Sequence, residues 1–194
     1  RTATPASDLH PSHAQQYKAI ITAICELVTN CETQLKQCNL PLGIGIPGAM
    51  SLTTGKIKNA NTVCLIGQDL AGDLSKQLER TVKLENDANC FALSEAVDGA
   101  GKKQNTVFAV ILGTGVGGGW VFNKRLHIGS NAIAGEWGHN PLPWPTDQDL
   151  PKQTCYCGKA GCIETYLSGP GFSQQTHLQF QFSASCPEII EAST

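Results

Sequence analysis

Three cysteines and one histidine form the most specific chemical pattern in this 194-residue sequence. Cys155, Cys157 and Cys162 fall within eight residues, and His139 precedes the first of them by sixteen. Three thiolates and one imidazole are the donor set of a closed tetrahedral zinc site, which leaves no coordination position for water. We therefore predict a structural Zn2+ bound by these four residues. The alternative interpretation is that the three cysteines are free thiols.

The other six of the nine cysteines are spread along the chain, at positions 25, 31, 38, 64, 90 and 186. The odd total of nine and the scatter of these six thiols favour a reducing, cytoplasmic location over a disulfide framework. Cys25, Cys31 and Cys38 lie along a predicted N-terminal helix, where we expect them to act as small apolar side chains.

A second pattern is a glycine-rich run at residues 113–119, which fits the letters G-x-G-x-x-G. A dinucleotide-binding fingerprint must open a helix, whereas residues 120–122 and 126–128 predict a β-hairpin around Asn123 and Lys124. Backbone N–H groups without side chains, together with a threonine hydroxyl, can instead bind phosphate oxygens. The alternative is a tight turn between two strands. The candidate phosphate-binding residues are Gly113, Thr114, Gly115, Gly117, Gly118 and Gly119.

Asp87 is the candidate general base, because it follows a short apolar strand at residues 82–84 and precedes a predicted helix. In phosphoryl transfer such a carboxylate mainly positions the attacking hydroxyl, since the transition state is loose. Asn86 stands beside it, and a helix N-terminus is a favourable place for negative charge. The alternative interpretation is an ordinary helix N-cap.

Two further carboxylates stand close to the predicted zinc ligands. Glu136 precedes His139 by three residues, and Glu164 follows Cys162 by two. A metal would bring both into one neighbourhood, where carboxylates and an imidazole can bind and discriminate sugar hydroxyls. The alternative is two solvated surface glutamates.

The pattern of elements predicts an α/β protein, because strands alternate with helices. A capping pattern at Ser12 and apolar residues at helical spacing predict one long helix to about residue 37. A strand at residues 42–46 ends at Pro47 and Gly48, and Leu70, Leu74 and Leu78 mark a second helix. Another strand covers residues 106–112. We place a lobe boundary in the polar segment 98–105, with one lobe at residues 1–104 and the next at 105–194.

Charge and hydropathy exclude two classes of partner. Fourteen Lys and Arg against sixteen Asp and Glu leave a net charge of -2, so neither nucleic acid nor an anionic membrane is expected to bind. The longest apolar run, residues 107–112, is far shorter than the ~20 residues of a membrane span. The chain begins with Arg1 and has no signal-peptide pattern, which favours a truncated start.

Five segments in order resemble the ROK family of sugar kinases and repressors. They are residues 45–48 (GIPG), 85–89 (ENDAN), 113–119 (GTGVGGG), 135–139 (GEWGH) and 155–164 (CYCGKAGCIE). The resemblance covers residues 5–172, and residues 127–144 look most like the fructokinase (mannofructokinase) branch. Family members open with an Asp-x-Gly-Gly-Thr loop that this chain lacks, and Arg1 to Asp8 look like the segment that follows it. We expect a chain cut at both ends.

The resemblance implies an actin-like, ribonuclease-H-like fold of two α/β lobes. It implies that Asp87 is the catalytic base and that ATP phosphates, with Mg2+, lie at the glycine run. It also implies that one nitrogen of His139 binds zinc while the other faces the sugar. A homodimer is implied as well. The implied substrate-binding residues are Gly48, Asn86, Asp87, Glu136, His139 and Glu164.

The function that follows is transfer of the γ-phosphate of ATP to the 6-hydroxyl of a hexose, with D-fructose first and mannose next. An N-acetylglucosamine kinase or a glucokinase is the alternative within the same class. A sugar-responsive repressor is the alternative of another class, and a non-catalytic zinc-binding fragment is a third. We expect the activity to belong to the full-length protein.

Overall fold

The computed structural model describes residues 12–181 and 184–192 and forms two compact units, Arg1–Asp87 and Ala88–Thr194. Helices and strands mix in both units, so the predicted α/β class is confirmed. The chain divides between the units at the start of a helix, whereas the predicted lobe boundary between residues 104 and 105 stays a prediction. The interpretation of Arg1 to Asp8 concerns residues outside the described part of the chain.

The first unit combines two helices with two small sheets. Strands β1 and β4 pair in parallel, with Ile46 opposite Asn86, and β2 pairs antiparallel with β3. The side chain of Ser12 caps the first helix by accepting a hydrogen bond from the Gln15 N–H. The elements are α1 (His13–Leu35), β1 (Leu42–Ile46), β2 (Ala49–Met50), β3 (Ile57–Lys58), the 3-10 helix η2 (Val63–Leu65), α2 (Leu70–Gln77) and β4 (Val82–Asn86).

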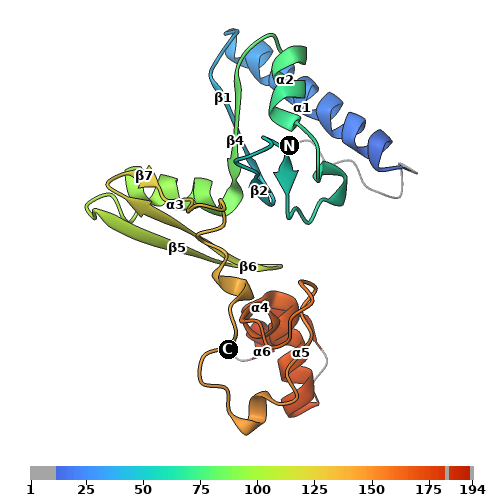
Figure 1. Ribbon diagram of the computed structural model, residues 1–194, viewed down its shortest axis with the longest axis vertical. Coiled ribbons are helices and arrows are strands. Elements are labelled where there is room, and N and C mark those ends of the chain that lie inside the picture. The colour runs from blue at the N-terminus through green and yellow to red at the C-terminus, as the bar shows by residue number, and fades with distance from the viewer. Residues whose placement is uncertain (1–11, 182–183, 193–194) are drawn as a thin grey trace. The chain divides into compact units, whose positions relative to one another are not determined.

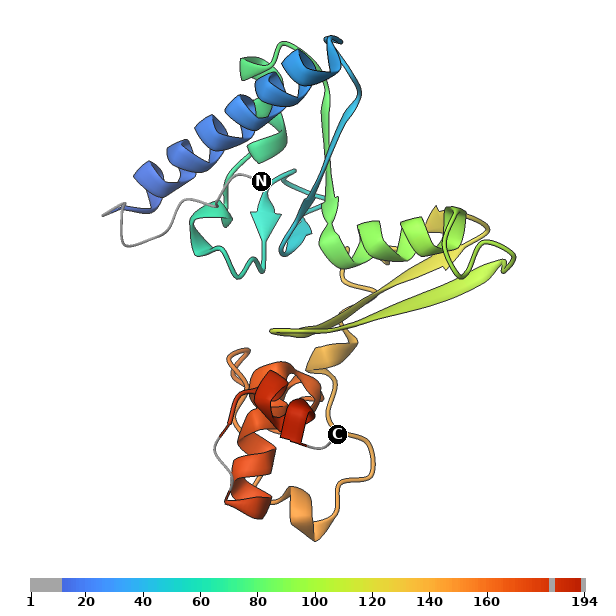
Figure 2. The ribbon, with the colours of Figure 1, turned by 180° about the vertical axis from the view of Figure 1, so that it is seen from behind.

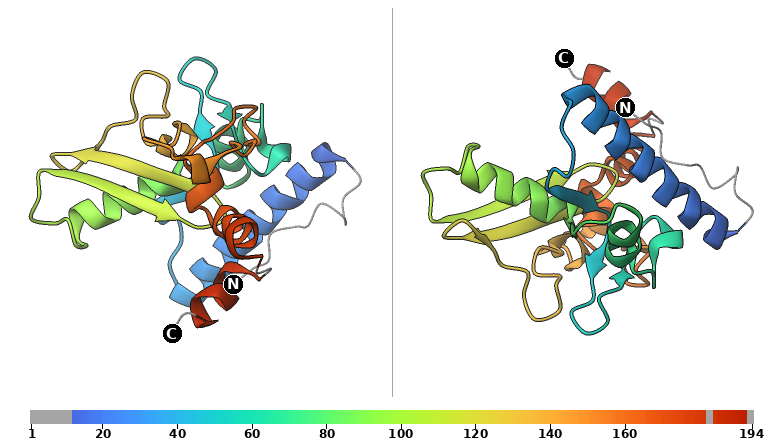
Figure 3. Two further views of the ribbon diagram at one scale, coloured as in Figure 1. Left: turned by 90° about the horizontal axis from the view of Figure 1, so that it is seen from below. Right: turned by 90° about the horizontal axis from the view of Figure 1, so that it is seen from above.

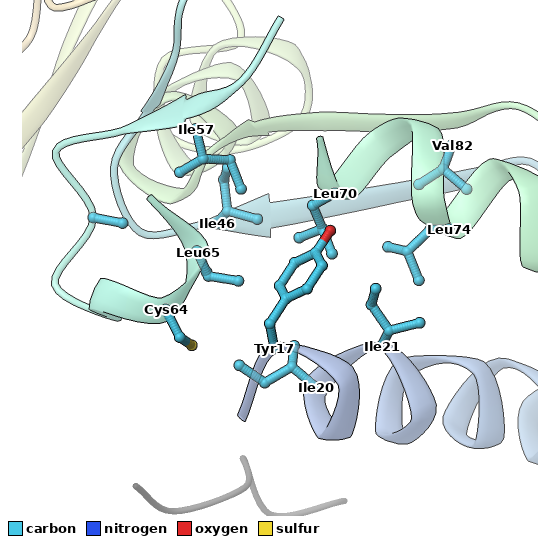
Figure 4. Close-up of a cluster of buried hydrophobic side chains, with 11 residues drawn as sticks. Tyr17, Ile20, Ile21, Ile46, Ile57, Cys64, Leu65, Leu70, Leu74 and Val82 are labelled. Atoms are coloured by element: carbon cyan, nitrogen blue, oxygen red, sulfur yellow. The ribbon is translucent and has the colours of Figure 1, made fainter. Parts of the chain in front are cut away.

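Large apolar side chains form the core of this unit, as Figure 4 shows. Tyr17, Ile20 and Ile21 of α1 pack against Leu70 and Leu74 of α2, and the last two are almost completely buried. Burial of each such side chain stabilises the fold by about 1.5–3 kcal/mol. This core holds the β1–β4 pair, and with it the ends of both strands.

The cysteines in and just after α1 correct one expectation. Cys25 packs against the core, but Cys31 and Cys38 are exposed and contribute nothing to it. The reason is length, because α1 has 23 residues and α2 has only eight, and the buried residues of α1 lie in its first half. The helical period predicted the apolar stripe correctly, but not how far along α1 other elements cover it.

The second unit begins with a helix that lies along one face of a three-stranded antiparallel sheet, as seen in Figures 1, 2 and 3. Ala92 and Ala96 of the helix are almost fully buried and pack with Ala109 and Val121 of the sheet. The elements are α3 (Asp87–Val97), whose first residue belongs to the preceding unit, β5 (Thr106–Leu112), β6 (Val116–Phe122) and β7 (Arg125–Leu126).

The predicted hairpin around Asn123 and Lys124 is confirmed. Both residues have positive φ, 48° and 61°, as the favoured two-residue hairpin turn requires. The ammonium group of Lys124 also donates to the carbonyl oxygens of Ala96, Lys102 and Gln104. These hydrogen bonds connect the hairpin turn to the end of α3 and to the turn that leads into β5.

The extent of the glycine-rich loop was predicted wrongly. Residues 116–122 form β6, which pairs with β5 from Leu112↔Val116 to Thr106↔Phe122, so only residues 113–115 make a turn. A Cβ on Gly119 would lie 2.7 Å from the Cβ of Ala92, and one on Gly118 would lie 2.9 Å from the Phe108 ring. These two glycines therefore allow α3 and an aromatic ring to approach the strand.

The rest of the unit is built from short helical elements and loops. These are η3 (Trp137–His139), η4 (Asp147–Asp149), α4 (Glu164–Leu167), α5 (Gly169–Phe180) and α6 (Cys186–Ala192). Two isolated bridges, between Pro141 and Cys162 and between Thr154 and Ala160, tie the loops together. Among the described residues, none of the helices has the length and apolar character of a membrane span.

Candidate functional site

The carboxyl ends of β1 and β4 bring three predicted site residues together in the first unit. The side-chain amide of Asn86 donates to the carbonyl oxygen of Gly48 at 2.8 Å. Gly48 has a φ of 91°, and a Cβ there would lie 2.6 Å from the Lys58 carbonyl oxygen, so the turn requires glycine. Asp87 follows at once as the first residue of α3, and its side chain is exposed.

His139, Cys155, Cys157 and Cys162 form one cluster in the second unit, as predicted. Their ligand atoms all lie within 4.8 Å of one another. Cys155 Sγ is 3.5 Å from His139 Nδ1, and Cys157 Sγ is 3.7 Å from Cys162 Sγ. The backbone turn between Cys155 and Lys159 holds two of these thiols, through a Cys155 N–H to Lys159 carbonyl bond of 2.7 Å.

The geometry of this cluster fits a tetrahedral metal ion. With Zn–S bonds of about 2.3 Å, two sulfur ligands of a tetrahedral zinc lie about 3.8 Å apart, close to the distance between Cys157 and Cys162. Four protein donors would close the coordination sphere, so such an ion would be structural. Both the donor set and the Cys157–Cys162 distance therefore fit zinc.

Two of the clustered thiols differ in acidity. The backbone N–H of Lys159 lowers the pKa of the Cys157 thiol, and hydrogen bonds from the neighbouring thiols add to this. Burial raises the pKa of the Cys162 thiol to about 12, and the adjacent thiols raise it further. A cation among them would reverse the second effect, because metal binding favours thiolates.

The segment that carries Glu136 and His139 lies directly against β6. A Cβ on Gly135 would overlap the carbonyl oxygen of Gly118, and one on Gly138 would overlap that of Val116. The indole N–H of Trp137 donates to the Gly117 carbonyl oxygen at 2.7 Å. Two glycines and one indole hydrogen bond thus fix the position of the backbone that carries the side chains of Glu136 and His139.

Glu164 connects the cysteine loop to the glycine turn. Its side chain is buried, and Oε2 accepts a hydrogen bond of 2.8 Å from the Val116 N–H. A Cβ on Gly115 would lie 2.8 Å from the same oxygen, which explains the glycine at that position. The alternative of a solvated surface glutamate is therefore wrong for Glu164.

Tyr156 is a residue that the sequence analysis missed. Its hydroxyl lies 3.0 Å from His139 Nε2, and the two rings meet edge to face with centroids 5.2 Å apart. Desolvation raises the pKa of Tyr156 to about 12, and the charges of Glu164, Cys155 and Glu136 add to this. The nitrogen of His139 that was expected to face a sugar thus faces a tyrosine hydroxyl.

The glycine turn opens onto a cavity of about 740 Å³ in the second unit. The N–H of Gly169, at the start of α5, donates to the Gly113 carbonyl oxygen at 2.8 Å and joins the helix to the turn. The cavity walls include Leu112, Gly113, Thr114, Phe172, Pro187 and Ile190. The sequence analysis missed this cavity, although Ser168 followed by Gly-Pro-Gly is a helix-start signal that could have placed α5.

The amino-acid sequence of the chain is similar to those of curated N-acetyl-D-glucosamine kinases. It is 44% identical over 184 residues to an N-acetyl-D-glucosamine kinase from Shigella flexneri, a match that covers 93% of this chain and 60% of the relative. The chain thus spans about three fifths of the length of the curated relatives it matches. Because those relatives are N-acetylglucosamine kinases, the prediction of the fructokinase branch is not supported.

Solved structures of ROK proteins have a fold similar to that of this chain. A ROK hexokinase from Thermus thermophilus is 27% identical with a TM-score of 0.74, over 90% of this chain and 55% of that one. A ROK glucokinase from Streptomyces griseus, in complex with glucose and AMPPNP, is 28% identical with a TM-score of 0.67, over 84% and 50%. Residues 5–192 match the ROK family, and the actin-like fold is thereby confirmed. The chain belongs to the ROK family.

Proposed function

We propose that the full-length protein transfers the γ-phosphate of ATP to the 6-hydroxyl of N-acetylglucosamine. The observation that carries this proposal is the 44% identity to the Shigella flexneri kinase of that name. This substrate was the alternative in the sequence analysis, and it replaces fructose. The residues support the reaction class, since carboxylates, an imidazole and a glycine turn are all present.

In this proposal Asp87 accepts the proton of the attacking hydroxyl. It is exposed at the head of α3, immediately after the carboxyl end of β4. Catalysis of phosphoryl transfer consists largely of positioning and charge stabilisation, which suits a carboxylate held at a strand end. The Asn86–Gly48 hydrogen bond fixes the neighbouring backbone, and both residues stay proposed substrate contacts.

Glu136, His139 and Glu164 are the proposed sugar ligands in the second unit. Carboxylates accept hydrogen bonds from hydroxyls, and a metal-bound imidazole carries its proton on the nitrogen that remains. The proposed Zn2+ holds His139 and the cysteine loop in position and takes no part in the transfer. Glu164 has one oxygen committed to the Val116 N–H, and its second oxygen is the proposed sugar contact.

ATP is proposed to place its phosphates at the turn formed by Gly113, Thr114 and Gly115. The adjoining cavity is within the usual size range of small-molecule sites, and its apolar walls suit a base. Gly117, Gly118 and Gly119 lie in β6, so we propose that they support the turn and stand back from the phosphates. Mg2+, a homodimer and a cytoplasmic location also remain proposals.

A coupled ADP-release assay on the full-length protein tests this function. With ATP and Mg2+, we expect the highest kcat/KM for N-acetylglucosamine among that sugar, glucose, mannose and fructose. Replacing Asp87 by Ala should lower kcat by about 10²–10⁴-fold while sugar binding persists. The matched control is Asp98→Ala, just beyond the other end of α3, which should leave kcat unchanged.

Each component of the proposal can fail separately. A preference for fructose would refute the substrate, and an Asp87→Ala variant as active as the Asp98→Ala control would refute the base. No turnover on any sugar by a folded, metal-loaded protein would refute the kinase and favour the repressor.

A further inference from the structure

Tyr156 occupies the one hydrogen-bonding position that the proposed function assigns to the substrate on His139. Its hydroxyl lies 3.0 Å from His139 Nε2, while His139 Nδ1 faces Cys155 Sγ at 3.5 Å. With a metal on Nδ1, the imidazole proton resides on Nε2. That single N–H points in one direction in the plane of the ring and has room for one good acceptor.

From this geometry we propose that Tyr156 is an internal competitor of the sugar and sets its affinity. The tyrosine hydroxyl accepts the hydrogen bond of His139 when no sugar is bound, and a sugar oxygen takes its place when one binds. The inference rests on the proposed sugar kinase function and deepens it. A sugar that offers no oxygen opposite His139 cannot displace Tyr156, so the residue also contributes to specificity.

The surroundings of Tyr156 allow its side chain to move without moving the loop. The residue is 75% exposed, and its ring meets His139 edge-on. The backbone on either side is held by the Cys155 to Lys159 bond and by the Gly158 N–H, which donates to the Cys155 carbonyl oxygen at 3.0 Å. A rotation of the tyrosine side chain therefore releases His139 while the thiols stay in place.

The same contact explains why the tyrosine is a competitor and not a bridge. If the hydroxyl stayed on Nε2, the sugar would have to bind His139 through an exposed phenol that little else fixes. Displacement exchanges one hydrogen bond for another of the same kind, so the penalty is that of one ordinary hydrogen bond. On that basis its removal should change sugar affinity about fivefold.

Tyr156→Phe in the full-length protein tests the inference, because it keeps the ring and removes only the hydroxyl. We expect KM for N-acetylglucosamine and the calorimetric Kd to fall about fivefold, with kcat and bound zinc unchanged. The matched control is Tyr17→Phe, which removes the hydroxyl that donates to Asp73 in the core of the first unit. That control should leave KM unchanged.

A spectroscopic measurement distinguishes displacement from a general effect on folding. With tyrosine labelled at the ring carbon that bears the hydroxyl, the Tyr156 signal is assigned by its loss in Tyr156→Phe. Saturating sugar should shift this signal, and the Tyr17 signal should stay. An active kinase whose KM rises or is unchanged in Tyr156→Phe overturns the inference alone. A full-length protein that binds no sugar overturns the proposed function as well.

Discussion

Different interactions stabilise the interiors of the two units of the chain. The first has a core of large apolar side chains, such as Ile21, Leu70 and Leu74. The core cluster of the second is small and rich in alanine, with Ala92, Ala96, Ala109 and Val121. Its functional segments are held instead by close glycine contacts, backbone hydrogen bonds and the Cys/His cluster.

The first unit thus draws its stability from apolar burial, whereas close contacts and proposed metal ligands position the candidate site residues of the second. Apolar burial is non-directional and scales with area, whereas glycine contacts and metal ligands demand particular positions. The first unit should therefore fold on its apolar core, and the loops of the second should depend on the ion. The predictions below test this contrast, from the largest expected effect to the smallest.

Metal removal should loosen the second unit and spare the first. Structural zinc contributes on the order of 10 kcal/mol in small zinc-finger peptides, so a chelator should strongly increase amide hydrogen exchange at residues 135–164. Exchange in α1 should not change. Cys157→Ser should reproduce the effect with loss of bound zinc, whereas Cys31→Ser, at an exposed thiol, should not. Equal protection with and without metal would contradict the contrast.

Gly135→Ala should destabilise the second unit by about 1–3 kcal/mol, because the new Cβ would overlap the Gly118 carbonyl oxygen. Urea unfolding followed by tryptophan fluorescence can measure this, since all three tryptophans lie at or beyond residue 120. Gly43→Ala is the control, because a Cβ at that position of β1 meets nothing within 4 Å. Similar midpoints for the two variants would show that β6 and η3 adapt freely.

The smallest effect concerns acid stability of the first unit. Arg80 Nη1 lies 2.6 Å from Glu32 Oε1, and this hydrogen bond lowers the pKa of Glu32. A lowered folded-state pKa means that the contribution is present above the unfolded pKa, about 4.3, and is lost as pH falls through the folded value. Glu32→Gln should therefore flatten the acid limb of the stability profile of α1, measured by hydrogen exchange.

The control for this pH dependence is Glu26→Gln, at an exposed position on the same helix. It should leave the acid limb as it is. A steep acid limb that survives in Glu32→Gln would assign the pH dependence to other carboxylates.

Much of the fold could be predicted from local patterns. Ser12 and the helical apolar period indicated the start of α1. A short apolar run closed by Pro47 and Gly48 indicated β1, and a short apolar run that leads into polar residues indicated β4. The start of β6 could not be predicted, because Gly117 to Gly119 carry no side-chain pattern. They form a strand because they pair with β5, and α3 and residues 135–138 pack closely against them, which are tertiary effects.

The candidate site was predictable where residue type alone defines the chemistry. The three cysteines and His139 form the predicted cluster, since few other arrangements bring thiols and an imidazole together in a short segment. Tyr156 was not predictable, because nothing in its spacing shows that its hydroxyl reaches His139. Sequence likewise could not show that Glu164 reaches back 48 residues to the Val116 N–H.

The contact between Glu164 and the glycine turn also constrains how this protein can evolve. Any side chain at position 115 would push against the carboxylate, and a shorter acid at position 164 would leave the Val116 N–H without its partner. Neither residue can change alone without cost. We expect positions 115 and 164 to covary among homologous sequences, so that a larger residue at one is matched by loss of the carboxylate at the other.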